Sequence, residues 1–149
     1  MKEGTKMDYD ESRTEEIRTA NINYLNGFED HLKNKGLSAK TIRTHIDNVD
    51  FFINYFLLNY EVRDVTHGCY SIGEFLGYFF IKKAMWSSVN AIKSNITSLK
   101  KFYSYLLEKD IISDDDYHFM CDIIDEDKNT WFARMERYEN IDEDNYDWY

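Results

Sequence analysis

The chain has no proline and only six glycines in 149 residues. The turns of a β-sandwich or an α/β domain use both residue types, so their scarcity argues against those folds. No stretch alternates polar and apolar residues well enough to predict a strand. The composition therefore predicts an all-α fold whose helices are joined by short polar turns.

Two further absences limit the class of protein. The only cysteines are Cys69 and Cys121, too few for a disulfide framework, which favours a reducing, intracellular setting. No apolar run approaches the roughly 20 residues that cross a bilayer, and the polar residues 1–16 do not resemble a signal or transit peptide. We expect a cytoplasmic protein with no membrane partner.

Acidic residues dominate overall, but unevenly. The net charge of −10 comprises −4 in residues 1–30, +5 in residues 31–109 and −11 in residues 110–149. A basic middle flanked by acidic ends is compatible with an anionic partner for the middle segment.

Apolar residues at intervals of three and four predict helices. The pattern places them at residues 12–35, 38–59, 71–84, 88–109 and from 113 onward, with a short last helix at 130–138. Residues 1–10 are expected to be disordered, residues 60–70 to form a loop and the last ten residues to form an acidic tail. Ser12–Glu15 and Ser71–Glu74 have the spacing of capping boxes. Gly36 is expected to end the first helix in a left-handed turn. The inward face of that helix is expected to comprise Ile17, Asn21 or Ala20, Tyr24, Phe28 and Leu32.

Two of these helices repeat each other at an interval of fifty residues. Ser38 corresponds to Ser88 and Arg43 to Lys93, and each helix has a basic, hydroxyl-rich first part and an aromatic end. The apolar stripe of the first helix comprises Ile42, Ile46, Val49, Phe52 and Phe56, and that of the second comprises Ile92, Ile96, Leu99, Phe102 and Leu106.

The order and spacing of these pieces resemble the N-terminal, SAM-like core-binding domain of tyrosine recombinases, the phage integrases. The resemblance covers about residues 15–112 and rests on three groups of residues. They are Tyr24, Leu25, Phe28, Leu32 and Gly36; Leu37, Ser38, Thr41, Ile42, Phe52 and Phe56; and Ser88, Ile92, Ile96, Leu99, Phe102, Tyr105 and Leu106. It implies a SAM-like bundle of four main helices over residues 11–112, and residues 113–149 would add one or two helices and the tail.

The sequence departs from the family pattern in three places. Ala91 stands where the second repeat usually has threonine, residues 110–149 are not a proline-containing linker, and no catalytic domain follows. The resemblance thus implies a non-catalytic DNA-binding protein that modulates site-specific recombination of a mobile element. We expect no enzymatic activity, no catalytic residues and no cofactor.

The candidate DNA contacts lie mostly at the starts of the two repeated helices. A helix N-terminus offers unpaired N–H groups and a partial positive charge to phosphates, and such contacts position a protein on DNA without reading its sequence. The candidates are Ser38, Lys40, Thr41, Arg43, Thr44, Ser88, Asn90, Lys93 and Lys100, with weaker support for Lys33, Lys35, Lys82 and Lys83. Ser87 and Ser94 add hydroxyl donors. The alternative is that the serines are ordinary helix caps and the lysines a solvated face.

The acidic segment 110–149 leaves three readings open: a solvating tail, a mask over the basic face, or a surface for a basic partner. The rival function is therefore a protein–protein interaction or inhibitor module that has lost DNA binding, with a recombinase as one candidate partner. A fragment or a decayed mobile-element remnant is a third alternative.

Two further candidates receive less support. His67, Cys69, His118 and Cys121 could supply four zinc ligands, but they lack a Cys-x-x-Cys core, so no metal site is expected. Trp86 is expected to anchor the core or a helix junction rather than stack on a base.

Overall fold

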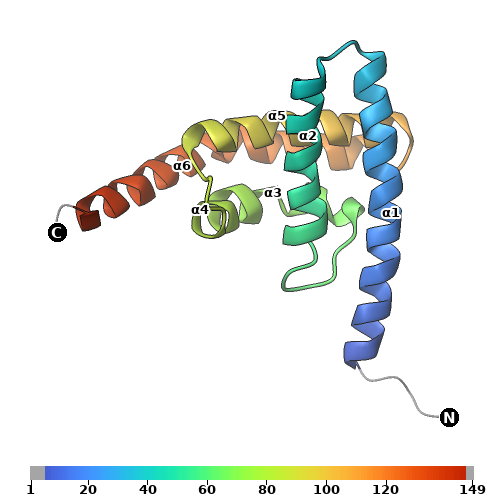
Figure 1. The fold of residues 1–149 in the computed structure, drawn as a ribbon, viewed down its shortest axis with the longest axis horizontal. Helices are drawn as coiled ribbons and strands as arrows, with labels where there is room; N and C mark the ends of the chain where they lie inside the picture. Colours follow the sequence, from blue (N-terminus) through green and yellow to red (C-terminus); the bar gives the residue numbers. More distant parts are fainter. Residues whose placement is uncertain (1–5, 147–149) are drawn as a thin grey trace. The chain divides into compact units, whose positions relative to one another are not determined.

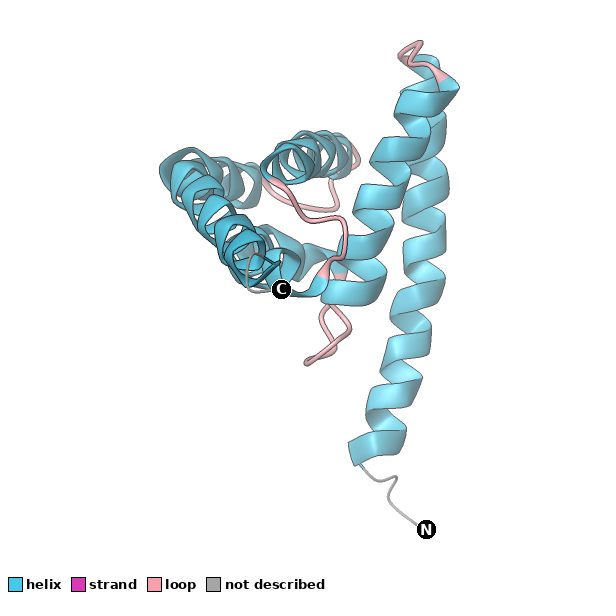
Figure 2. Ribbon diagram, turned by 60° about the vertical axis from the view of Figure 1, so that its left-hand side comes forward, coloured by secondary structure: helices cyan, strands magenta, loops and turns pink. Residues whose placement is uncertain are grey.

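The computed structural model describes the backbone of residues 6–146 and the side chains of residues 10–141. Figure 2 shows only helices and loops over that range, and no strand occurs within it. The predicted all-α class is confirmed.

Figure 1 shows the order of the elements. They are α1 (Lys6–Asn34), α2 (Ala39–Asp50), η1 (Phe51–Phe56), η2 (Val65–Tyr70), α3 (Ile72–Glu74), η3 (Phe75–Phe79), α4 (Phe80–Lys83), α5 (Val89–Glu108) and α6 (Asp114–Tyr146). The π-helix η1 continues α2, and the π-helix η3 joins α3 to α4. The predicted helices at 38–59, 71–84 and 88–109 are thus present, with differences at their ends.

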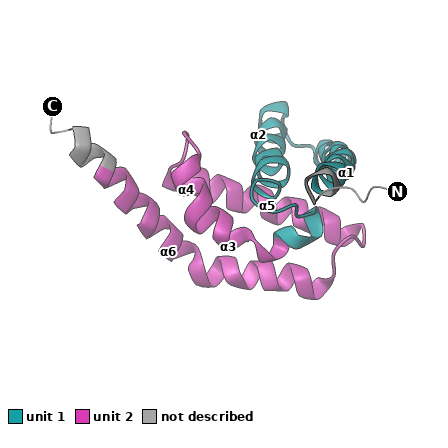
Figure 3. Ribbon diagram, turned by 90° about the horizontal axis from the view of Figure 1, so that it is seen from below, with its two compact units in different colours: residues 1–68 teal, residues 69–149 magenta. Residues whose placement is uncertain are grey.

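The chain forms two compact units, coloured separately in Figure 3. Unit 1 comprises residues 1–68, with α1, α2 and η1, and unit 2 comprises residues 69–149, with α3 to α6. We describe each unit by itself.

In unit 1, α1 packs against α2 and η1. The predicted inner face of α1 is largely confirmed, because Ile17, Phe28 and Leu32 are buried. Asn21 lies on the same face, and its side-chain amide donates hydrogen bonds to the Ile53 carbonyl at 3.3 Å and to Asn54 Oδ1 at 2.8 Å. The buried polar residue is therefore held by the π-helical segment.

The predicted turn at Gly36 is also confirmed. Gly36 has a positive φ of 80°, and bonds from Gly36 N to Lys33 O and from Leu37 N to Leu32 O close the end of α1. This is the Schellman arrangement, which satisfies carbonyls that the helix leaves unpaired.

The end of α5 repeats this arrangement. There Asp110 takes the positive φ, at 59°, and the bonds run from Asp110 N to Leu107 O and from Ile111 N to Leu106 O. Short polar side chains tolerate this conformation better than most non-glycine residues do. Ser113 and Asp116 then start α6 as a capping box, in which Asp116 N donates to Ser113 Oγ at 3.1 Å.

In unit 2, α6 packs along α5, α3 and η3. Helix α6 lies close to η3 at Gly77, where an added Cβ would lie 3.0 Å from Trp131 Cδ1. Trp131 and Met135 are buried, and Arg134 donates a 2.7 Å hydrogen bond to the Gly77 carbonyl. Helix α6 is therefore part of the core of unit 2.

Several predicted boundaries were wrong. Helix α1 begins at Lys6, so residues 6–10 are helical, Ser12 lies inside the helix and does not cap it, and residues 1–5 lie outside the described range. Ser71 makes no capping hydrogen bond to the helix that follows it.

Residues 60–70, expected to be a loop, contain the 3₁₀-helix η2. One helix replaces the two predicted after residue 113 and most of the expected tail, since α6 runs without a break to Tyr146. Contact with the rest of unit 2 orders this acidic segment, and composition alone does not reveal such packing.

Among the residues that the structure describes, no helix has both the length and the apolar character that a membrane span requires.

The Gly77 contact predicts a large effect from one added methyl group. Gly77→Ala should destabilise the protein by about 1–3 kcal/mol, the usual cost of overpacking, although alanine is the better helix former. Gly73→Ala is the matched control, because its Cβ would meet side-chain atoms at 3.9 Å, an ordinary contact distance. Urea unfolding of both variants tests this. A Gly77→Ala protein as stable as Gly73→Ala would contradict the tight approach.

Candidate nucleic-acid interface

The starts of α2 and α5 have the same local hydrogen bonding. Ser38 and Ser88 both have extended backbone conformations as N-caps. The Ser38 hydroxyl accepts from Thr41 N at 3.2 Å, and the Ser88 hydroxyl accepts from Ala91 N at 3.0 Å. The predicted repeat therefore extends to the capping bonds, since each serine occupies the same position relative to its helix.

Each capped start leaves backbone donors that the helix itself cannot satisfy. By position these are Ala39 and Lys40 in α2, and Val89 and Asn90 in α5. Neither helix has an acidic residue in its first turn. The partial positive charge of each N-terminus is therefore not neutralised by its own first turn.

The hydroxyl groups contribute less than predicted. Thr44 donates back to the Lys40 carbonyl at 3.2 Å, as is common for threonine inside a helix. Ser38 donates to Thr41 Oγ1 at 3.0 Å, and Ser87 donates to the Ile81 carbonyl at 3.2 Å. In the observed conformation the hydroxyl groups of Ser38, Thr44 and Ser87 therefore donate to groups within the protein, and whether they also serve a phosphate stays a prediction.

The basic side chains of α2 are exposed, as a phosphate contact requires. Lys40 is exposed, and the Arg43 side chain is 80% exposed. Arg43 Nε lies 3.3 Å from Asp47 Oδ1, one turn along the helix. A pair this exposed contributes little to stability, so Arg43 remains available to another anion.

The predicted lysines of α5 contact α6. The ammonium group of Lys93 lies 5.3 Å from the centre of the Phe132 ring, and Lys100 Nζ lies 3.8 Å from Asp125 Oδ1. Seven residues forward along α5 correspond to seven residues back along α6, so the two helices run antiparallel. Lys93 remains exposed, whereas Lys100 is half-buried.

The structure thus divides the predicted site residues between two helices. Ser38, Lys40, Thr41, Arg43 and Thr44 lie in the cap and first turns of α2, in unit 1, and Ser88, Asn90, Lys93 and Lys100 lie along α5, in unit 2. Within each unit the residues lie close to one helix start, except Lys100, which lies two turns beyond Lys93.

Comparison with known protein families matches residues 24–113 to the N-terminal SAM-like domain of phage integrases. The chain belongs to this family. Membership relates it to site-specific recombination. No curated protein and no solved structure gives a significant match.

The match contains both repeated helices of this integrase SAM-like domain but ends immediately before α6. The helix that contacts Lys93 and Lys100 therefore lies outside the matched segment.

The loop between α4 and α5, residues 84–88, carries features that the sequence analysis did not combine. Met85 is 98% exposed and Trp86 is 56% exposed, so Trp86 is not a core residue. Its ring packs edge-on against Phe80 of α4, which agrees with the other alternative, an anchor at a helix junction. The distribution of charge could have drawn attention to this loop from the sequence alone. Residues 75–107 of the integrase SAM-like domain contain five lysines and no acidic residue. The lysines are Lys82, Lys83, Lys93, Lys100 and Lys101.

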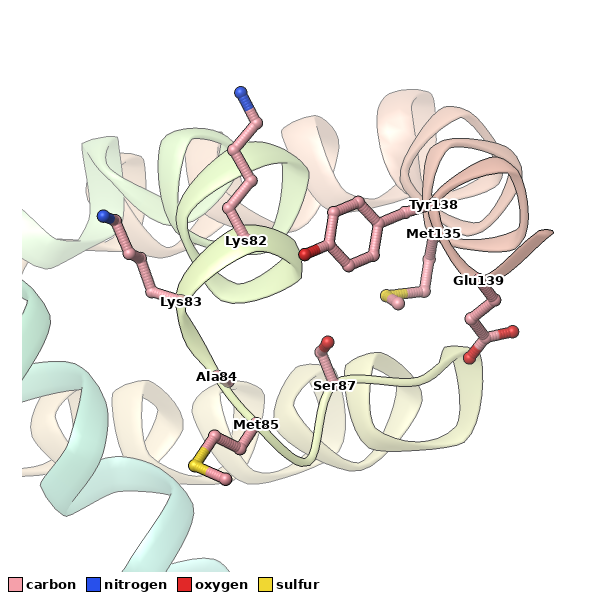
Figure 4. Close-up of a pocket in the computed structure, with 8 residues that line it drawn as sticks. All are labelled: Lys82, Lys83, Ala84, Met85, Ser87, Met135, Tyr138 and Glu139. Carbon is pink, nitrogen blue, oxygen red and sulfur yellow. The ribbon is translucent and has the colours of Figure 1, made fainter. Parts of the chain in front are cut away.

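A cavity of about 290 Å³ lies beside this loop and is drawn in Figure 4. Met135, Tyr138 and Glu139 of α6 line one side, and Lys82 and Lys83 lie on the other. Its lining carries charges of both signs and defines no ligand.

Cys69, Tyr70 and Asp116 have pKa values shifted by their surroundings. Burial raises the pKa of Cys69 to about 12, which leaves a neutral thiol near pH 7. The Tyr70 hydroxyl donates a hydrogen bond to Asp116, which lowers the pKa of that carboxyl group and raises the pKa of the phenol. Across the described side chains, no three histidine, cysteine or acidic residues gather as a metal site would require.

Two substitutions at Ser88 test whether its role at the start of α5 is helix capping. Ser88→Ala should lower the free energy of unfolding by about 1 kcal/mol, whereas Ser88→Asp should retain it because aspartate is an equally good cap. Thermal and urea unfolding measure both effects. Equal losses in the two variants would show that the serine is needed for something other than capping.

Proposed function

We propose that this chain binds duplex DNA through phosphate contacts from the starts of α2 and α5, and that it takes no part in the chemistry of strand exchange. The observation that carries the proposal is the same capped, acid-free helix start at both places, beside the exposed basic residues Lys40, Arg43 and Lys93. Family membership supports a DNA partner in general terms.

The expected mode of binding is electrostatic. Lysine and arginine that neutralise phosphates release condensed counterions, so affinity falls steeply with salt. The backbone donors at a helix start add short-range contacts to phosphate oxygens. Neither contribution reads bases, so sequence preference is expected to be weak.

A non-catalytic role fits the groups that are present. In tyrosine recombinases the nucleophilic tyrosine works with an arginine-rich pocket, and the integrase segment matched here is the N-terminal domain rather than the catalytic one. The more buried cysteine, Cys69, has a raised pKa that makes it a poor nucleophile. We therefore assign binding to this chain and chemistry to another domain or partner.

A duplex-binding titration at low and moderate salt tests the proposal. Lys40→Gln with Arg43→Gln should weaken binding about tenfold at low salt and reduce the salt slope by about two counterions, because two phosphate contacts are lost. Ser88→Asp should also weaken binding while keeping stability, because its carboxylate repels phosphate at the start of α5.

The matched control is Lys128→Gln with Arg137→Gln, which makes the same change in net charge on α6. This variant should bind like the unaltered protein. Failure of the unaltered protein to bind any duplex at low salt would overturn the proposal. Equal losses in the two double variants would replace the α2 site with a general charge effect.

A second candidate function is a protein–protein interaction or inhibitor module that uses α6. One observation favours it: Asp125 and Phe132 of α6 already contact two of the lysines proposed for DNA. The outer side of the same helix exposes further acids, among them Asp115, Asp122 and Glu126. On this reading the acidic surface meets a basic partner such as a recombinase, and DNA binding is lost.

A pair of isosteric variants discriminates the two functions. Asp125→Asn should tighten DNA binding by about twofold more than Asp122→Asn, since both remove one negative charge but only the first releases Lys100. An exposed ion pair of this kind is worth at most about 1 kcal/mol, which limits the gain to about fivefold. Anisotropy titrations measure it. If the two variants bind DNA with the same affinity, α6 does not restrain Lys100. If neither variant binds DNA, the interaction module is favoured.

A further inference from the structure

We propose that Met85 is an apolar wedge that enters the DNA duplex between neighbouring base pairs when the start of α5 contacts the backbone. This rests on the proposed DNA binding and goes beyond it, because phosphate contacts alone leave the base stack intact. The proposal starts from the 98% exposure of Met85, whose side chain contributes almost nothing to the core.

The loop that carries Met85 is a defined turn. The Ser87 backbone N–H donates to the Ala84 carbonyl at 3.2 Å, which closes a four-residue turn with Met85 and Trp86 at its tip. The Ser87 hydroxyl ties the same turn to the Ile81 carbonyl at 3.2 Å. A turn held at both sides presents its tip without a large ordering cost on binding.

Trp86, the second residue at the tip of the turn, packs against a buried aromatic ring. Its ring lies edge-on to Phe80, with ring centres 6.4 Å apart, and Phe80 is fully buried. Aromatic pairs in this geometry are favourable. Trp86 is thus anchored against Phe80 although it is 56% exposed, and it follows Met85 directly in the turn.

The charged side chains nearest to the tip along the chain are basic. Lys82 and Lys83 precede the turn and are both exposed, and Ser88 caps α5 immediately after it. Figure 4 shows both ammonium groups pointing away from the cavity and the Met85 side chain pointing away from Met135. The nearest acidic residues along the chain are Glu74 and Glu108. In space, Glu139 of α6 lines the same cavity as Met85, Lys82 and Lys83, so one acid faces the lysine side of the loop across that cavity.

An apolar tip flanked by phosphate-binding groups suits one class of partner. Duplex DNA places a row of phosphates on each side of a groove whose floor consists of base edges, and the apolar base faces are stacked on one another behind those edges. Methionine is among the side chains that proteins insert between base steps, which partly unstacks them and kinks the duplex.

The wedge predicts a preference for DNA that is already kinked. Unstacking one base step costs a few kcal/mol of free energy. In a duplex with a two-base bulge the stack is already partly disrupted, so less free energy is needed to insert a side chain. The unaltered protein should bind the bulged duplex about tenfold more tightly than a continuous duplex of the same length. Met85→Ala should lose most of this preference while keeping its affinity for the continuous duplex within about threefold, because the phosphate contacts remain.

Two variants make the test specific. Met85→Leu restores an apolar side chain of similar size and should retain the preference. Ile141→Ala removes another exposed apolar side chain, 59% exposed on α6, and should behave like the unaltered protein.

Competition titrations with the two duplexes separate the outcomes. Equal affinity of the unaltered protein for both duplexes, or an undiminished preference in Met85→Ala, overturns the wedge and leaves the proposed DNA binding intact. Absence of binding to either duplex at low salt overturns the DNA binding as well. Binding to phosphatidylserine vesicles without binding to DNA would reassign the loop to a membrane surface and also overturn the wedge.

Discussion

The fold depends on ending one helix and starting the next within a few residues, and this chain does so without proline. At the ends of both α1 and α5 the backbone turns through one residue with positive φ, Gly36 or Asp110. A serine cap then starts the next helix, Ser38 before α2 and Ser113 before α6. Each arrangement satisfies the carbonyls that one helix leaves unpaired and one of the N–H groups of the next.

The same solution creates the surface features that we connect with function. A serine that caps a helix accepts a hydrogen bond from its third residue and leaves the first two backbone donors facing outward. With no acid in the first turn, these donors retain their partial positive charge in both α2 and α5. The serines that stabilise these two helix starts therefore also shape the surface that we propose for phosphate binding.

Much of the negative net charge lies on α6, which is a packed helix of unit 2. The acidic segment is a packed helix whose Trp131 lies against Gly77 and whose Arg134 bonds to the Gly77 carbonyl and lies over the Tyr78 ring. Its acids are held beside α5, where Asp125 meets Lys100. The segment therefore lowers the positive potential along one side of α5, while the turn at Met85 precedes that helix and lies beside Lys82 and Lys83.

The sequence by itself determined the helical class, the family, the fifty-residue repeat, the Gly36 turn and the capping roles of Ser38 and Ser88. These follow from local patterns, because caps, turns and amphipathic stripes are set by residues within a few positions of one another. Only the tertiary structure decided that α6 is continuous, that Lys93 and Lys100 contact Phe132 and Asp125, and that Met85 and Trp86 are exposed. These features depend on tertiary contacts between residues that are far apart in the sequence. Neither composition nor periodicity specifies such contacts.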